Sequence, residues 1–209
     1  MFKAVIWDFG GVITSSPFEA FNRYEAANGL PKDFIRGINA TNPDDNAWAR
    51  LESSQVTAAE FDDLFRQEAE AKGHTVPGSD VLKLLSGDLR PQMVQALKTI
   101  KATMTIACIT NNVKNEDMPT ATKGSRFAEV MDLFDTVIES SKVGVRKPEP
   151  AIYHMACEAI GIAPNEAVFL DDLGINLKPA RALGMTTIKV VDPDEALREL
   201  SGHLGIALP

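Results

Sequence analysis

Five short apolar runs separated by long connections constrain the fold of this 209-residue chain more than any other feature. The runs are Phe2–Trp7, Met104–Ile109, Phe134–Ile138, Ala167–Leu170 and Thr186–Val191. Parallel strands need crossover connections of a dozen or more residues, and strands that are buried on both faces are apolar without alternation. Because helical patterns fill the connections, the sequence predicts a doubly wound, Rossmann-like α/β fold with these five strands in a parallel sheet.

The connection between the first two runs is far longer than one crossover helix requires. Ser16 with Glu19 and Thr57 with Glu60 both match the capping-box pattern of a helix start, and apolar residues follow Thr57 at helical spacing. We therefore expect residues 16–89 to form an inserted α-helical cap over a core made of residues 1–15 and 90–209.

The charge balance argues against two classes of partner. The chain carries 29 acidic and 21 basic residues, a formal net charge of −8, so at long range it repels nucleic acid and anionic membranes. An anionic substrate must then be attracted by local groups.

The two cysteines, Cys108 and Cys157, have neither metal-ligand nor redox spacing and predict buried thiols in a reducing compartment. The first residues read as a strand rather than a signal peptide, and no apolar run has membrane-spanning length. The expected location is the cytoplasm.

Polar residues stand at four of the five predicted strand ends. In open α/β sheets ligands bind beyond the carboxyl ends of the strands, so these positions are the first candidates for a site. They are Asp8, Gly10 and Gly11 after the first run, Thr110 and Asn111 after the second, Lys147 before the helix that follows the third, and Asp171 and Asp172 after the fourth.

Taken singly, most of these residues have ordinary explanations as turn, cap or surface positions. The adjacent acids Asp171 and Asp172 are harder to explain in this way. Two like charges at the end of a buried strand are costly unless a cation or hydrogen bonds compensate them. The pair therefore indicates a metal site.

Together the four strand ends suit phosphoryl transfer, in which oxygen ligands hold magnesium and a fixed cation neutralises the phosphate. Asp8 is the candidate nucleophile, because a carboxylate that attacks phosphorus divides hydrolysis into two easier displacements. The hydroxyl and backbone N–H of Thr110 suit phosphate oxygens, and Lys147 would balance the charge of both the phosphate and Asp8.

This ordered set of motifs resembles the haloacid dehalogenase-like hydrolase superfamily along the whole chain. The second half is most similar to the phosphatase-like N-terminal domain of soluble epoxide hydrolase, whereas the epoxide-opening domain has no counterpart. The segments that carry this similarity are 134–139, 143–144, 147–150, 152–153, 168–172 and 176–181.

The resemblance implies a Mg²⁺ ion held by Asp8, the backbone carbonyl of Gly10 and Asp172. Asp171 and Asn176 would support these ligands without binding the metal. Phosphate would be bound by Gly11, Thr110, Asn111 and Lys147, with Asp8 and Lys147 as the catalytic pair.

Gly10 departs from the pattern of the superfamily. Its phosphatases usually carry a second Asp two residues after the nucleophile, which protonates the leaving group and then activates water. The backbone carbonyl survives this change, so magnesium binding is less affected than the second chemical step.

Two cap residues, Trp48 and Arg50, lie where the resemblance implies substrate specificity. Arg50 suits a second anionic group on the substrate. A packed tryptophan beside a surface arginine explains the same two residues equally well.

Three functions remain open on the sequence. The first is Mg²⁺-dependent hydrolysis of small phosphorylated metabolites through an aspartyl-phosphate on Asp8. The second is metal-free 2-haloacid dehalogenation, which Gly10 permits and which the paired acids disfavour. The third is a catalytically weak or inactive phosphate-binding protein. The sequence does not decide between a monomer and a homodimer.

Overall fold

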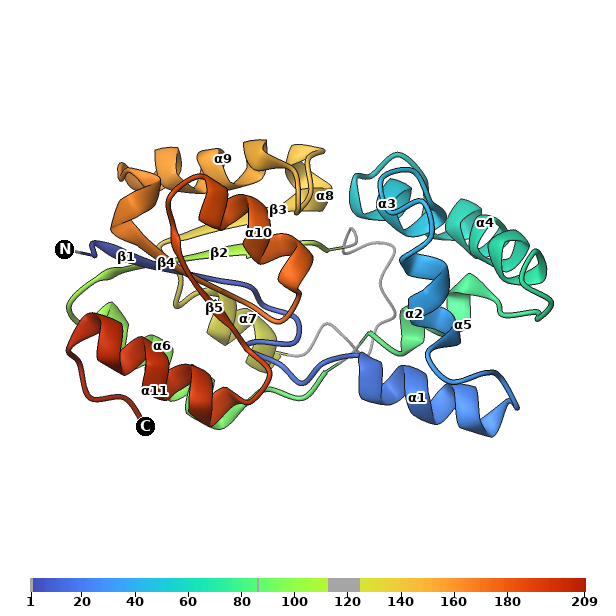
Figure 1. The fold of residues 1–209 in the computed structure, drawn as a ribbon, viewed down its shortest axis with the longest axis horizontal. Helices are drawn as coiled ribbons and strands as arrows, with labels where there is room; N and C mark the ends of the chain where they lie inside the picture. The colour runs from blue at the N-terminus through green and yellow to red at the C-terminus, as the bar shows by residue number, and fades with distance from the viewer. Residues whose placement is uncertain (1, 86, 113–124) are drawn as a thin grey trace.

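A five-stranded parallel sheet forms the centre of the protein, as the apolar runs predict. The computed structural model describes residues 2–85, 87–112 and 125–209 (Figure 1). The strand order is β3-β2-β1-β4-β5. The strands are β1 (Ala4–Trp7), β2 (Thr105–Thr110), β3 (Thr136–Glu139), β4 (Ala167–Asp171) and β5 (Thr186–Lys189).

The predicted strand positions are right and their ends are shifted by one or two residues. The third run begins at Phe134, yet β3 begins at Thr136, because Phe134 packs into the core before the strand pairs begin. The fifth run was predicted to reach Val191, whereas β5 ends at Lys189 and Val191 is exposed.

Helices cover both faces of the sheet (Figure 1). Ile6 of β1 packs on the side of α9 (Pro150–Ile160) and α10 (Gly174–Ala182), while its neighbours Val5 and Trp7 pack on the opposite side. That opposite side is covered by α6 (Pro91–Lys101), α7 (Ser125–Met131) and α11 (Pro193–Leu204). The short α8 (Ser140–Val143) follows β3, and the 3₁₀ helix η2 (Pro164–Glu166) precedes β4. The predicted doubly wound α/β fold is thus confirmed.

Of the six helices that the structure describes between β1 and β2, the first five lie beyond the carboxyl ends of the strands (Figure 1). They are α1 (Phe18–Ala27), α2 (Phe34–Asn39), α3 (Ala47–Glu52), α4 (Ala58–Glu70) and α5 (Gly78–Lys83). They share a hydrophobic cluster of their own, which includes Phe21, Phe61 and Phe65. We call residues 16–89 the cap. Its exact boundaries stay a prediction.

Two local predictions for the cap have different outcomes. The capping box of Thr57 and Glu60 is present at the start of α4. The capping box predicted for Ser16 and Glu19 is wrong: α1 begins at Phe18 behind Pro17, which has no capping side chain, and the Ser16 hydroxyl instead accepts a bond from the Phe18 N–H at 3.5 Å.

Both cysteine side chains are buried and unpaired, as expected. Over the ranges that the structure describes, every helix is too short or too polar to cross a membrane.

Candidate active site

Three carboxylates converge at the carboxyl ends of two neighbouring strands. The register of the sheet places Trp7 opposite Leu170, so Asp8, next after β1, lies beside Asp171 and Asp172 at the end of β4. One oxygen atom from each carboxylate lies within 4.8 Å of the others. The sheet therefore brings together the acids that the sequence predicted as a site.

A buried lysine partly compensates this negative charge. The ammonium of Lys147 lies 2.8 Å from Asp8 Oδ1 and 2.7 Å from Asp171 Oδ2. Its side chain is 1% exposed. Burial alone lowers the pKa of Lys147, but the two carboxylates outweigh burial and raise it above its usual value. Lys147 is thus a fixed positive charge.

Asp171 is held in place on both of its oxygen atoms. It accepts hydrogen bonds from the Leu173 N–H at 2.8 Å and from the Asn176 amide at 3.1 Å, in addition to the bond from Lys147. Asp171 is fully buried, and both of its oxygen atoms accept hydrogen bonds. These bonds fix the direction from which Lys147 approaches Asp8.

Asp8 is constrained on one oxygen only. Its Oδ1 accepts bonds from Lys147 and from the Phe9 N–H at 2.7 Å. Oδ2 accepts no hydrogen bond from the described residues. Burial raises the pKa of Asp8, and Asp171 and Asp172 raise it further against the opposing effect of Lys147. The arrangement leaves one carboxylate oxygen available to a ligand.

Asp172 is the third acid, and it lies closest to solvent. Burial, followed by repulsion from Asp171, raises its pKa to about 6. Three carboxylates facing one ammonium leave an excess of negative charge in a mostly buried site.

The donor set of this site fits magnesium. Mg²⁺ prefers a small number of carboxylate and carbonyl oxygens, and a divalent ion would neutralise the excess charge. Asp8 and Asp172 would supply carboxylate ligands, and the part of the Gly10 carbonyl stays a prediction.

The two glycines that follow Asp8 have opposite steric environments. Gly11 has a left-handed backbone (φ +76°), and a Cβ atom there would lie 2.3 Å from Asp172 Oδ2. Only glycine allows this close approach. A Cβ atom at Gly10 would meet no heavy atom of the described residues within 4 Å. The missing acid therefore leaves open space rather than a filled site.

The two residues expected to bind phosphate at the end of β2 differ in what they already contact. Thr110 is buried, and among the described residues its hydroxyl makes one long bond, 3.5 Å, to the Asn111 carbonyl. The Asn111 amide bonds both the N–H and the carbonyl of Lys147, at 2.8 and 2.9 Å. It thus positions the lysine, and its phosphate contact stays a prediction.

Sequence reasoning missed a buried ion pair that joins the cap to this site. Arg146 donates through Nε and Nη2 to Glu52 Oε2, at 2.8 and 2.6 Å, and through Nη1 to the Pro43 carbonyl at 2.9 Å. The same Glu52 oxygen accepts a bond from Asn111 at 3.2 Å. Burial raises the pKa of Glu52, and Arg146 opposes that effect. The only signal in the sequence was a basic residue directly before Lys147.

Trp48 and Arg50, the predicted specificity residues, have structural partners. The Trp48 ring packs edge-on against Phe61, with 5.4 Å between ring centroids. Arg50 makes two bonds to Asp45, at 2.9 and 3.0 Å, on the surface of the cap. Their role in specificity stays a prediction.

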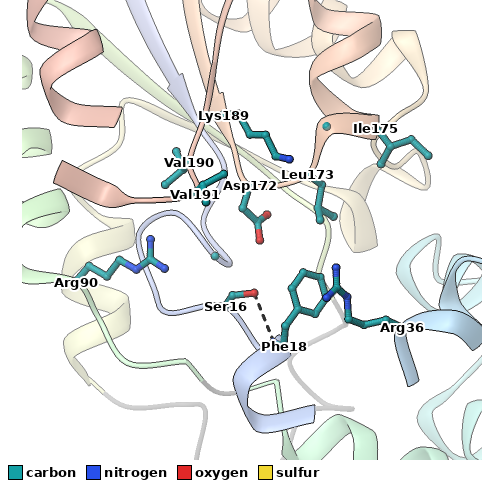
Figure 2. A pocket seen from close by; sticks show the side chains of 12 residues that line it. Ser16, Phe18, Arg36, Arg90, Asp172, Leu173, Ile175, Lys189, Val190 and Val191 are labelled. Carbon is teal, nitrogen blue, oxygen red and sulfur yellow. Dashed lines mark hydrogen bonds between the residues drawn. The ribbon is translucent and has the colours of Figure 1, made fainter. Parts of the chain in front are cut away.

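A pocket of about 470 Å³ opens beside Asp172, between the core and the cap. Figure 2 shows that basic side chains reach it from three directions, with the Asp172 carboxylate between them. The residues that line it are Gly11, Ser16, Phe18, Arg36, Arg90, Asp172, Leu173, Gly174, Ile175, Lys189, Val190 and Val191. Apart from Asp172 and Gly11, sequence analysis assigned none of them to the site.

The known proteins that this chain is similar to agree with the assignment made from the strand-end motifs. The model of the haloacid dehalogenase-like hydrolases matches residues 2–184. The mouse acyl-CoA dehydrogenase family member 10 is 36% identical over 99% of this chain, and mouse bifunctional epoxide hydrolase 2 is 33% identical over 99%. The chain spans only 20% and 40% of the lengths of these two relatives. A sesquiterpene phosphatase of Aspergillus oryzae is 27% identical, with 98% of this chain and 97% of the relative covered.

Solved structures share the fold at lower identity. A HAD family enzyme from Bacteroides thetaiotaomicron, in complex with magnesium and inorganic phosphate, superposes with a TM-score of 0.60 at 24% identity, covering 90% of this chain and 94% of its own. L-2-haloacid dehalogenase from Xanthobacter autotrophicus, with chloropropionic acid covalently bound, has a TM-score of 0.64 at 21% identity, covering 99% and 85%.

Proposed function

Because this chain belongs to the haloacid dehalogenase-like hydrolase family, we propose that it is a Mg²⁺-dependent phosphatase of small organic phosphate monoesters. The observation that carries the proposal is the charge balance of the buried site: Asp8, Asp171 and Asp172 lie together, and the ammonium of Lys147 bonds the first two of them. Such a site is suited to a divalent cation together with a phosphate group. The similarity to a named phosphatase over almost the whole of both chains supports the same reaction class.

Asp8 is the nucleophile in this proposal. Lys147 and the Phe9 N–H occupy its Oδ1, which directs Oδ2 toward the incoming phosphorus atom. Oδ2 forms a bond to phosphorus, the bond from phosphorus to the alcohol oxygen breaks, and the phosphoryl group stays on Asp8. Water then attacks the phosphorus of this aspartyl-phosphate, which releases inorganic phosphate and restores the carboxylate.

Lys147 and Thr110 bind the phosphoryl oxygens, and Asp171 holds Lys147 in place. Magnesium, when held by Asp8, Asp172 and the Gly10 carbonyl, supplies further neutralisation of the phosphate charge.

Position 10 sets the expected speed of the reaction. The alkoxide that leaves and the water that attacks both require a proton transfer, and Gly10 has no side chain to assist either. A positioned acid–base group contributes about 10²- to 10⁴-fold to such steps. We therefore expect slow turnover in which solvent carries the protons.

Phosphate release from a panel of phosphorylated sugars, lipids and nucleotides, with and without Mg²⁺, tests the proposal. Asp8→Asn is the matched blank because it keeps the shape of the side chain and removes the nucleophile. Trapping the wild-type protein by acid quench and detecting a phosphorylated Asp8 by mass spectrometry tests the covalent step. The proposal fails if no monoester is hydrolysed with Mg²⁺ and Asp8→Asn behaves like the wild type.

Metal-free dehalogenation is a second candidate, because displacement of halide by Asp8 needs no acid at position 10. Release of chloride from a short 2-chloroalkanoate in the presence of a chelator would favour it over the phosphatase. Against it, the uncompensated acids of the metal-free site repel a carboxylate substrate.

A further inference from the structure

The pocket beside Asp172 has a charge opposite to that of the protein as a whole. The chain carries a net charge of −8, yet three of the residues that line the pocket are basic and only Asp172 is acidic. Gly11 and Asp172 belong both to this lining and to the candidate active site. The pocket therefore adjoins the site, between the core and the cap.

Arg90 presents an unsatisfied donor. Its backbone N–H bonds the Ile13 carbonyl at 2.8 Å, which fixes the residue at the start of α6. Its Nη1 atom is buried and has no hydrogen-bond partner in the part of the chain that the structure describes. A buried donor without a partner is costly, so an acceptor supplied by a ligand would be favoured here. Figure 2 shows the Arg90 guanidinium pointing toward the Asp172 side of the pocket.

Arg36 and Lys189 face the pocket from the cap and from β5. The Arg36 guanidinium lies 4.2 Å above the Phe18 ring, and among the described residues it makes one bond, at 3.1 Å, to the exposed Asp33. Such an exposed pair is worth little and leaves the other N–H groups free. Lys189 is exposed and forms no ion pair with the residues described. Both cations are thus available to a ligand.

The remaining wall of the pocket is apolar. Ile175 and Val191 are 54% and 76% exposed, although both are large hydrophobic residues. They line the pocket together with Leu173 and Val190. An aliphatic segment of a ligand would remove this surface from water.

We propose that the pocket selects phosphate monoesters whose alcohol portion carries a second anionic group on a short aliphatic spacer. The phosphate occupies the site at Asp8, the spacer lies against Ile175 and Val191, and the second anion contacts Arg90, Arg36 and Lys189. Arginine N–H groups pair well with carboxylate and phosphate oxygens. This inference rests on the proposed phosphatase function and assigns specificity to these three cations rather than to Arg50, which bonds Asp45.

Matched ligand pairs separate this inference from the phosphatase proposal. The substrates are 3-phosphonooxypropanoate and propyl phosphate, which differ only by the carboxylate, and the readout is the ratio of their kcat/KM values with Mg²⁺. The corresponding non-hydrolysable pair, 4-phosphonobutanoate and butylphosphonate, is used for calorimetric binding, which needs no turnover.

The variants are Arg36→Gln, Lys189→Gln and Arg90→Gln. Arg36 and Lys189 are exposed, so their variants keep the test valid even if Arg90→Gln fails to fold. Arg66→Gln is the control, because Arg66 is an exposed arginine of α4 that pairs with Asp63 and Glu70 outside the pocket.

We expect the wild type to prefer the carboxylate-bearing member of each pair by about tenfold or more, and each pocket variant to reduce that preference by about threefold to tenfold. Arg66→Gln should keep the wild-type ratio. If butylphosphonate binds and propyl phosphate is hydrolysed but no preference exists, the inference is overturned and the phosphatase proposal stands. If neither member of either pair binds or reacts while other monoesters are hydrolysed with Mg²⁺, the inference is likewise overturned and the phosphatase proposal stands.

Discussion

Arg146→Met should destabilise the protein far more than its position near the surface of the fold suggests. The side chains of Arg146 and Glu52 are 15% and 8% exposed. Among the described residues, the methionine leaves the buried Glu52 carboxylate with only the Asn111 amide and the Trp48 indole as donors. Removing one partner of a buried ion pair costs about 3–5 kcal/mol. Because Arg146 is partly exposed, this pair lies at the lower end of that range, so we expect the free energy of unfolding to fall by about 3 kcal/mol at pH 7.

Two control variants test whether this loss of stability comes from the buried ion pair. Arg66→Met breaks two exposed ion pairs on α4 and should cost about 0–1 kcal/mol. The double variant Arg146→Met/Glu52→Gln replaces the buried pair by neutral groups of similar size, so it should recover most of the loss. Arg146→Met alone should also regain part of its lost stability near pH 5. Without Arg146 the folded-state pKa of Glu52 rises further above its unfolded value, and the folded protein takes up a proton as the pH falls.

Urea unfolding followed by tryptophan fluorescence measures the effect. The chain has two tryptophans, Trp7 in β1 and Trp48 in α3. In a Trp7→Phe background, Trp48 reports on the cap at the position next to the ion pair. With an m-value of about 2–3 kcal/mol per M, the expected loss moves the midpoint by roughly 1–1.5 M. If Arg146→Met and Arg66→Met shift the midpoint equally, or if the double variant is no more stable than Arg146→Met, the buried pair does not join the cap to the core as argued.

Further predictions concern the site itself. Asp8→Asn should reduce phosphate release by about a thousandfold or more, measured in single-turnover assays, because the nucleophile is lost. Gly10→Asp has room for its side chain among the described residues and should raise kcat measured with Mg²⁺ at saturating substrate; an unchanged kcat would show that proton transfer by solvent does not limit turnover. Gly11→Ala should weaken Mg²⁺ binding measured by calorimetry, because its methyl group would displace the Asp172 carboxylate, whereas unchanged affinity would argue against Asp172 as a ligand. In chelator, Asp172→Asn should stabilise the protein by roughly 1–2 kcal/mol at pH 7. The folded-state pKa of about 6 lies above the unfolded value, so the ionised group opposes folding above pH 6 and is neutral in both states below pH 4. A pH-independent difference in unfolding free energy would contradict that assignment.

The strand ends were predictable because their signals are local. Each strand is a short apolar run buried on both faces, so the first polar residue after it marks the ligand-binding edge of the sheet. Asp8, Thr110 and the pair Asp171–Asp172 were found in this way, and the structure places their strands side by side.

The residues that sequence reasoning missed depend on contacts between distant segments. Glu52 and Arg146 are 94 positions apart, and each alone resembles an ordinary helical or loop charge. Arg36, Arg90 and Lys189 come from the cap, from the start of α6 and from β5, so no spacing rule relates them. Sequence analysis chose Arg50 as the cap arginine that contacts a second anionic group of the substrate. Arg50 pairs with Asp45 instead, because the path of the cap helices decides which arginine reaches the pocket.

The Asn111 amide uses its oxygen and its N–H groups on two separate parts of the protein, the backbone of Lys147 and the cap residue Glu52. Any motion of the cap that breaks its bond to Asn111 would therefore also disturb the placement of the lysine. Linkage is reciprocal, so a ligand that binds more tightly when Lys147 is correctly placed must favour the closed cap by the same factor. Substrate affinity and cap opening would then change together in any variant of this amide, even though Asn111 takes part in neither bond-making nor bond-breaking.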